Sequence, residues 1–217
     1  ASAHRARLSV VRAADGRAGA GAIAYYHSNG RLRNALVINN TADGDGAAMF
    51  FDASSPRLEN ITMAGNLTTN GVGGAMNISY LSHPVLMNSI VWGNGSNPII
   101  FHTRWYGMAL TVESSDLEGG LAGIQTYDLG PVNGLGNNLE VDPVFVSPGN
   151  YRLSTLSPCN NSGTNQAWML IESDIADSDR ILDGIVNLGA YEEAATFIPQ
   201  DRGTLSCVID PDASVLM

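Results

Sequence analysis

The feature of this sequence that most constrains its fold is a repeat of about 26 residues between residues 19 and 97. Segments that begin at Gly19, Gly44 and Gly71 resemble one another, and equivalent residues recur at spacings of 26 to 28. The marker columns are Ile23, Met49 and Met76; Leu32, Leu58 and Leu86; Asn34, Asn60 and Asn88; and Asn40, Asn66 and Asn94. Because several independent columns agree on one period, the stretch is identified as a repeat architecture.

Each repeat consists of short strands. Its apolar runs end after a few residues at Gly, Asn, Ser or Pro, which excludes helical repeats. In the first strand, Ile23 and Tyr25 are expected to point inward while Ala24 and Tyr26 point outward. A second strand follows the first asparagine column in each repeat, and it contains Leu36 with Ile38, Ile61 with Met63, and Ile90 with Trp92. The pattern predicts an all-β fold, a right-handed parallel β-helix (β-solenoid) with an irregular C-terminal cap or tail.

The asparagine columns have a structural interpretation. Amides at the same place on successive coils can each donate to one neighbour and accept from the other. Asparagine also tolerates the left-handed backbone conformation of sharp corners. We therefore predict that both columns form ladders: Asn34, Asn60 and Asn88, and Asn40, Asn66 and Asn94. The alternative for the second column is that it lines a ligand groove.

Composition excludes several functions. The 217 residues include 21 acidic and 11 basic residues, all of the basic ones arginine, for a formal charge of −10. Without a basic face, nucleic acid and anionic membranes are not expected as partners. The lack of lysine removes Schiff-base chemistry. No apolar run approaches the length of a membrane span.

We predict three segments. Residues 1–125 form the coils, 126–192 form degenerate final coils and a cap, and 193–217 form an extension able to make a strand. The first coil carries no polar cap, so either the chain is part of a longer solenoid or another chain covers this surface. In the extension, Leu205, Cys207 and Ile209 alternate as a candidate assembly strand. Cys207 pairs with Cys159 in a disulfide, or both are buried thiols; the sequence leaves both open.

Few residues suggest chemistry. Arg104, Trp105 and Tyr106 lie on an expected loop and could stack on sugar rings, although closure of the core by Trp105 is the favoured interpretation. Asp43 and Asp45 resemble a calcium loop but lack further spaced acidic ligands, so a solvated turn is favoured and no cofactor is expected. Histidine metal spacings and Gly-x-Ser-x-Gly motifs are absent, which favours a protein that is not an enzyme.

The second half of the chain resembles a known family. Its motifs are Ser-Ser-Asp-Leu-Glu-Gly-Gly from Ser114, Asp142-Pro143, Tyr151-Arg152-Leu153-Ser154, Ser157-Pro158-Cys159 and Gly189-Ala190-Tyr191-Glu192. In combination they are similar to the C-terminal part of secreted bacterial right-handed parallel β-helix repeat proteins of the choice-of-anchor type. With the upstream coils, the resemblance covers residues 19–192. It implies an extracellular, surface-associated protein. The chain departs from the pattern at Asn160 to Gly163 and continues for 26 residues beyond Tyr191.

Three functional hypotheses follow. The first is a structural or adhesive cell-surface protein that assembles end to end with copies of itself into a filament by strand pairing. The second is a carbohydrate-binding or polysaccharide-degrading module, lyase-like or hydrolase-like, with an extracellular polysaccharide as partner. The third is that the chain is the C-terminal part of a longer protein whose functional region lies upstream.

Overall fold

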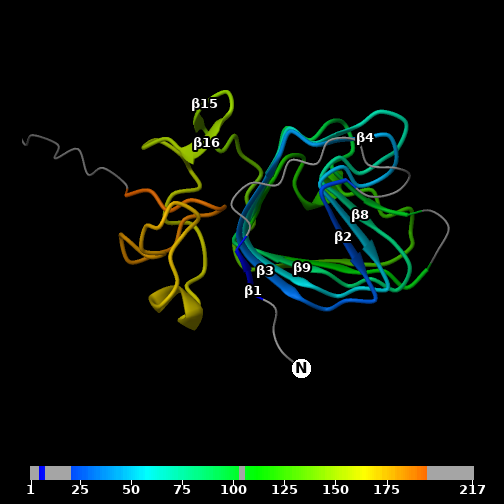
Figure 1. Ribbon diagram of the computed structural model, residues 1–217, viewed down its shortest axis with the longest axis horizontal. Helices are drawn as coiled ribbons and strands as arrows, with labels where there is room; N and C mark the ends of the chain where they lie inside the picture. The colour runs from blue at the N-terminus through cyan, green and yellow to red at the C-terminus, as the bar shows by residue number, and fades with distance from the viewer. Residues whose placement is uncertain (1–4, 8–20, 103–105, 195–217) are drawn as a thin grey trace, which may run out of the picture.

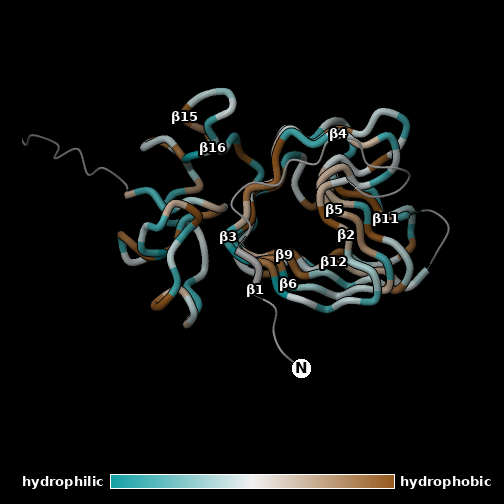
Figure 2. The backbone as a smooth tube through the Cα atoms, viewed as in Figure 1, coloured by the Kyte–Doolittle hydropathy of each residue, from teal (hydrophilic) through white to brown (hydrophobic). Residues whose placement is uncertain are grey.

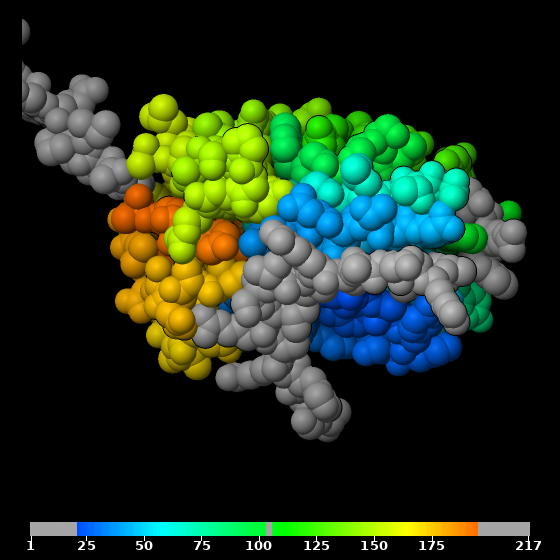
Figure 3. Space-filling view, turned by 45° about the horizontal axis from the view of Figure 1, so that its top comes forward, coloured from blue at the N-terminus to red at the C-terminus, as the bar shows by residue number. Residues whose placement is uncertain are grey.

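The computed structural model describes residues 5–7, 21–102 and 106–194. It is all-β, a parallel β-solenoid of about four turns, and this confirms the fold class predicted from the repeat. Figure 1 looks along the stacked coils, and Figure 3 shows them piled in sequence order from blue through cyan to green. Equivalent residues of successive coils lie beside one another, as the period requires.

The larger sheet runs along one side of every coil. Its strands are, in spatial order, β1 (Arg5–Arg7), β3 (Arg31–Ile38), β6 (Arg57–Ala64), β9 (Val85–Met87), β12 (Leu110–Glu113) and β14 (Val132–Leu135). Two short strands continue it, because β10 (Ile90–Trp92) pairs with both β6 and β13 (Asp116–Leu117). All of these pairs are parallel, and Leu32, Leu58 and Leu86 share one register position.

The smaller sheet forms the opposite wall. Its order is β2 (Ile23–Tyr26), β5 (Met49–Asp52), β8 (Met76–Ile78) and β11 (Ile99–Phe101). A short parallel pair, β4 (Thr41–Ala42) with β7 (Leu67–Thr68), stacks at the turn between the sheets. Ile23, Met49 and Met76 are in register, as the repeat columns predict.

The core lies between the two sheets, where Figure 2 shows the apolar segments. Met49, Phe51, Met76 and Ile78 are fully buried there. Tyr25 stacks on Phe51 with ring centroids 5.4 Å apart, and burial raises the pKa of Tyr25 to about 12. Stacking identical inward positions therefore builds a continuous apolar column from short strands that could not bury themselves alone.

The second strand of each coil departs from the sequence-based alignment. The register pairs Leu36 and Ile90 with Thr62, whereas Ile61 pairs with Ala35. Ile61 and Met63 thus point into the core, while Leu36, Ile38, Ile90 and Trp92 pack in two separate clusters outside it. Both faces of β3 and β6 are covered here, so apolar residues occur on both and alternation cannot identify the inner one.

The chain after Leu139 lies on the flank of the solenoid. Parallel pairing extends to β14, and an isolated bridge joins Asp116 to Leu139. Residues 140–194, here called the C-terminal segment, then form an antiparallel hairpin of β15 (Phe145–Ser147) and β16 (Asn150–Leu153), followed by loops and the short 3-10 helix η2 (Ala167–Leu170). Another short helix, η1 (Leu121–Gly123), lies within the last coil. Figures 1 and 3 show the segment, yellow to orange, beside the coils.

Candidate functional site

One asparagine column forms a buried ladder at the turn after β3, β6 and β10. Asn40 Nδ2 donates to Asn66 Oδ1 at 2.7 Å, and Asn66 Nδ2 donates to Asn94 Oδ1 at 2.8 Å. The same two oxygens accept the backbone N–H groups of Asn40 and Asn66. Asn66 Nδ2 also donates to the Val37 carbonyl at 2.8 Å, and Asn94 Nδ2 donates to the Met63 carbonyl at 2.9 Å. These amides are engaged in closing the coils, so they do not offer a ligand groove.

The other asparagine column has a different role from the ladder predicted for it. Asn34, Asn60 and Asn88 occupy the left-handed backbone region, with φ of 50°, 55° and 49°. Their amides donate to backbone carbonyls of the C-terminal segment: Asn34 to Ser173 (2.8 Å), Asn60 to Asn187 (3.2 Å) and Asn88 to Thr164 (2.9 Å). The column therefore fastens this segment to three successive coils.

A buried arginine holds the C-terminal segment together. Arg180 donates to the carbonyls of Ala190 (3.0 Å), Gly189 (2.8 Å) and Asn187 (3.2 Å), and its Nη2 lies 3.7 Å from Glu192 Oε2. Burial lowers the pKa of Arg180 to about 10 and raises the pKa of Glu192 to about 7, while the opposite charge of each partner acts against these shifts. This pair is a structural element that sequence reasoning missed.

Cys159 is a buried free thiol. Its Sγ lies 3.3 Å from Asp116 Oδ2, across the boundary between the C-terminal segment and β13. Burial raises the pKa of Cys159, and the negative charge of Asp116 raises it further. Since the thiolate is the reactive form, this cysteine is a poor nucleophile. Cys207 lies outside the described residues.

The two candidate calcium ligands join successive turns. Asp43 Oδ1 accepts a hydrogen bond from Thr69 Oγ1 at 2.9 Å. Asp45 Oδ1 accepts the N–H of Val72 at 3.0 Å, and its Oδ2 lies 3.4 Å from His102 Nε2. Within the described ranges, no group of three or more His, Cys, Asp or Glu residues could hold a metal ion.

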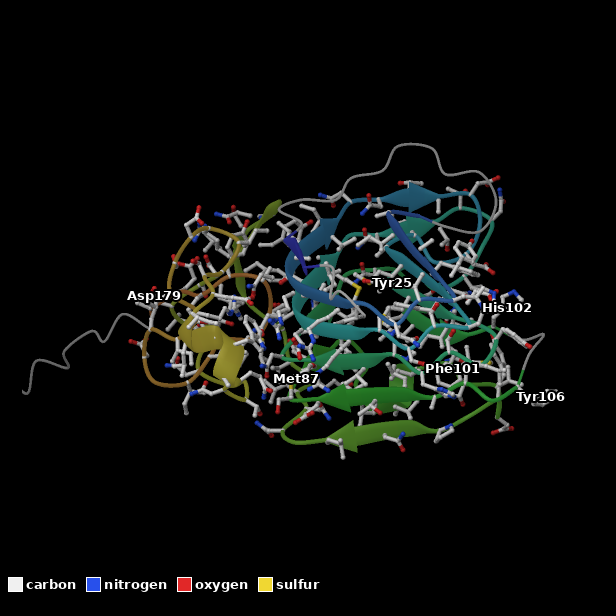
Figure 4. The ribbon with its side chains drawn as sticks, turned by 60° about the horizontal axis from the view of Figure 1, so that its bottom comes forward. Tyr25, Met87, Phe101, His102, Tyr106 and Asp179 are labelled. Atoms are coloured by element: carbon white, nitrogen blue, oxygen red, sulfur yellow. The ribbon has the colours of Figure 1, made fainter. Side chains whose placement is uncertain are left out.

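Tyrosines are exposed near the smaller sheet. Tyr106 is 77% exposed, and Figure 4 shows it projecting from the molecule near His102. Tyr26, at the end of β2, is also exposed, as is Tyr80, which follows β8. Tyr80 and Leu81 have positive φ, which is unusual for bulky residues. Arg104 and Trp105, the other residues of the predicted sugar-binding loop, lie outside the described residues.

An arginine cluster marks the start of the larger sheet. Glu59 is buried and receives Arg33 Nε and Arg57 Nε at 2.6 Å each, with Arg31 Nε at 3.6 Å. Arg33 also contacts the C-terminal segment, through Glu172 at 3.0 Å and with its guanidinium 4.2 Å from the centre of the Trp168 ring. The sequence contains a signal for this cluster, because arginines recur at the repeat spacing of 26 residues. They form two columns, one of Arg5, Arg31 and Arg57 and one of Arg7 and Arg33.

Among the residues that the structure describes, the last coil of the solenoid is open on its outer side. Residues 133–137 are exposed, and Val132 and Leu121 pack against the core while remaining partly accessible. Leu135 is 50% exposed. In the part of the chain that the structure describes, β12 is the single strand paired with β14. The candidate assembly strand of Leu205, Cys207 and Ile209 lies outside the described residues. The open last coil is therefore the described surface most suited to an interaction.

In the described ranges, no helix combines the length and hydrophobicity that crossing a membrane requires. Comparison of the chain with models of protein families, with curated proteins and with solved structures found no match.

Proposed function

We propose that this chain is a structural or adhesive β-solenoid of a secreted, cell-surface protein, and that its copies assemble end to end into a filament by strand pairing. The observation that carries the proposal is the last coil, where no other described residues pair with the outer edge of β14 and the end of the apolar core is partly accessible. The extracellular location follows from the resemblance of the C-terminal motifs to proteins of the choice-of-anchor type.

The backbone of β14 offers a pairing edge. The carbonyls of Pro131 and Leu135 accept hydrogen bonds from Leu110 N–H (3.1 Å) and Ser114 N–H (3.2 Å), on the β12 side. In a parallel strand, alternate residues direct their backbone groups to opposite sides. Val132 and Gly134 therefore present theirs to the free edge, where a further strand could pair.

The partner that fits this edge is the first coil of a second copy. Its β1 strand is parallel to β3 and pairs in the described residues with β3 alone. Placing β1 of one copy on β14 of another continues the same parallel sheet. Because the two surfaces differ, the contact is heterologous and does not close, which produces a filament.

The test is a lysine at the end of the core. Val132→Lys places a charge in the last apolar layer and should leave monomers, because stacking a second copy would bury it. Val146→Lys, at a 53% exposed position of the C-terminal segment, is the matched control and should assemble normally. Sedimentation velocity and electron microscopy measure the outcome. A wild-type chain that stays monomeric at all concentrations would contradict the proposal.

A second candidate function is carbohydrate binding. The observation that favours it is the set of exposed tyrosines that lie in or after strands of the smaller sheet: Tyr26, Tyr80 and Tyr106. Tyrosine rings can stack on sugars and supply hydroxyl groups. Calcium could bridge Asp45 to an acidic sugar as part of this alternative. A glycan array, with and without calcium, and an assay for cleaved polysaccharide separate this function from assembly.

A further inference from the structure

Two arginines lie side by side on the outer face of the larger sheet. Arg31 of β3 and Arg57 of β6 occupy the same register position, which places their backbones about 4.8 Å apart. Their side chains are 50% and 35% exposed. Like charges directly opposite each other in a sheet are destabilising. Packing of the solenoid alone therefore does not explain why both positions carry arginine.

The nearby carboxylate of Glu59 does not satisfy both arginines. Its Oε1 accepts a hydrogen bond from Arg57 Nε at 2.6 Å, and its Oε2 accepts one from Arg33 Nε at 2.6 Å. Arg31 Nε lies 3.6 Å from Oε2, which is longer than a normal hydrogen bond. Among the residues that the structure describes, no other carboxylate pairs with Arg31 or Arg57. In this part of the chain, the guanidinium of Arg31 therefore keeps donors that a ligand can use.

Two other arginines show the contrast. Arg152 pairs with Glu193, and Arg180 donates to three backbone carbonyls. Carboxylates are abundant in the chain, which has 21 acidic residues and 11 basic ones. An adjacent pair of partly exposed arginines, Arg31 and Arg57, with one shared carboxylate is therefore an exception in this molecule. Such a pair is suited to bind an anion, because each guanidinium presents several N–H donors in one plane.

Glu59 shows how a carboxylate fits between arginines of these two strands. It receives Arg33 of β3 on one oxygen and Arg57 of β6 on the other, at 2.6 Å each. Hydrogen bonds between a guanidinium and a carboxylate are stronger than those between neutral groups. A carboxylate from a ligand can bind between Arg31 and Arg57 in the same manner. It would also offset the repulsion between the two positive charges.

We infer that Arg31 and Arg57 bind the carboxylate of an acidic sugar. The same outward column continues with Val85 and then Thr111, both partly exposed. Successive strands are about 4.8 Å apart, so a sugar ring whose carboxylate lies at the arginines covers Val85 and directs a hydroxyl toward Thr111. An apolar surface with a few placed polar groups is typical of small-ligand sites.

The ligand is an isolated carboxylate and not a densely charged polymer. The whole chain has a formal charge of −10, which repels a polyanion such as nucleic acid at long range. This inference goes beyond the proposed function. Its residues lie on the outer face of the larger sheet, away from the open last coil and from the exposed tyrosines of the smaller sheet. The site therefore does not require copies of the chain to assemble.

The test measures binding of galacturonate to the folded chain by nuclear magnetic resonance titration. The methyl ester of galacturonate has the same ring without the charge, and acetate has the charge without the ring. Galacturonate should bind the wild-type chain about tenfold more tightly than its methyl ester, because the ester cannot form charge-assisted hydrogen bonds. It should bind about threefold or more tightly than acetate, because the ring adds contacts with Val85 and Thr111.

Substitution of Arg31 identifies the site. Arg31→Gln should weaken binding of galacturonate by about tenfold or more. Arg152→Gln is the matched control, because it removes the same charge from an arginine that has its own partner, and it should bind as the wild type does. Without ligand, Arg31→Gln should melt at the wild-type temperature or above it, because one of two opposed like charges is gone. Galacturonate should raise the melting temperature of the wild type and not that of the variant.

Several results would overturn the inference. One is a folded wild-type chain that does not bind galacturonate. Another is equal affinity for galacturonate and its methyl ester, or for galacturonate and acetate. Equal weakening in Arg31→Gln and Arg152→Gln would show that net charge, and not this pair, governs binding. Tighter binding of a glutamate tripeptide than of galacturonate would assign the site to an acidic protein partner instead. None of these results bears on end-to-end assembly, which sedimentation measures separately.

Discussion

At the scale of single residues, ionisable side chains of kinds that act in catalysis in other proteins have structural roles here. Arg180 and Glu192 are fully buried, and the three carbonyls that receive Arg180 all belong to its own segment. A buried ion pair needs such additional hydrogen bonds to offset the cost of removing both charges from water. The pair therefore determines the internal shape of the C-terminal segment.

Glu192 makes stability depend on pH. Its pKa is about 7 in the folded protein against an ordinary value of 4.5, so the folded state retains a proton that the unfolded chain releases between these values. The stabilisation is complete below pH about 4.5 and is lost as the pH rises through about 7. We expect the free energy of unfolding to fall by on the order of 2–3 kcal/mol across this window.

Urea unfolding at pH 4.5, 6 and 8 measures this effect. Glu192→Gln keeps an oxygen for the Asn187 N–H and should remove most of the fall. Glu193→Gln, one residue further along, is the control and should preserve it. An unchanged pH dependence in Glu192→Gln would show that another group is responsible.

At the scale of elements, two asparagine columns with the same period perform different tasks. In the Asn40, Asn66 and Asn94 column, stacked amides bond to one another. In the Asn34, Asn60 and Asn88 column, the left-handed backbone accompanies side chains that leave the stack and reach a distant segment. The same residue type therefore closes a turn in one place and binds a covering segment in another.

The ladder should be most sensitive at its middle rung. Asn66→Ala removes the acceptor of the Asn40 side chain and backbone N–H, and it removes the side-chain donor to Asn94 Oδ1 and to the Val37 carbonyl. We expect a loss of about 2–4 kcal/mol in unfolding free energy, because buried polar groups left unpaired cost about 1–3 kcal/mol each. Asn40→Ala, at the end of the ladder, should cost less. Equilibrium denaturation compares the two, and an equal loss in both would argue against a cooperative ladder.

At the scale of the whole molecule, stability is distributed along one axis. Each coil contacts its neighbours, so a central coil has support from both sides and a terminal coil from one. The described solenoid shows this in its packing, because Met63 and Leu86 are fully buried whereas Val132 is partly accessible. A terminal coil has a neighbouring coil on one side only, so contact with a second copy should stabilise it more than a central coil.

Hydrogen exchange should follow this axis. In the monomeric Val132→Lys variant, we expect amides of β6 and β9 to exchange most slowly, and amides of β14 to exchange faster by about tenfold or more, because the last coil opens without disturbing the rest. Exchange measured by mass spectrometry on peptides from each coil provides the comparison. Equal protection in all coils would indicate a single cooperative unit instead.

The repeat by itself determined the parallel solenoid, the coil length and the inward residues of the first strand. The spacing of the repeat columns indicates which residues stack on successive coils. The alternation of inward and outward residues along a strand indicates which of them share a face. For Met49 and Phe51 that was sufficient, because one face of β5 meets the core and the other is more accessible. The excess of arginine at one end and of carboxylates at the other is also readable in the printed sequence.

Only the tertiary structure decided where the C-terminal segment lies and, through it, the faces of the second strand. Once that segment covers β3 and β6 from outside, Leu36 and Ile90 are buried on the outer face and Asn34 and Asn60 find carbonyl partners there. Local pattern cannot reveal this, because burial by a segment distant in the sequence, 127 residues away for Asn60 and Asn187, leaves the same apolar signature as burial in the core. The exposure of β14 in the described part of the chain likewise depends on which other segments pack against it, and the sequence of the strand alone does not encode that.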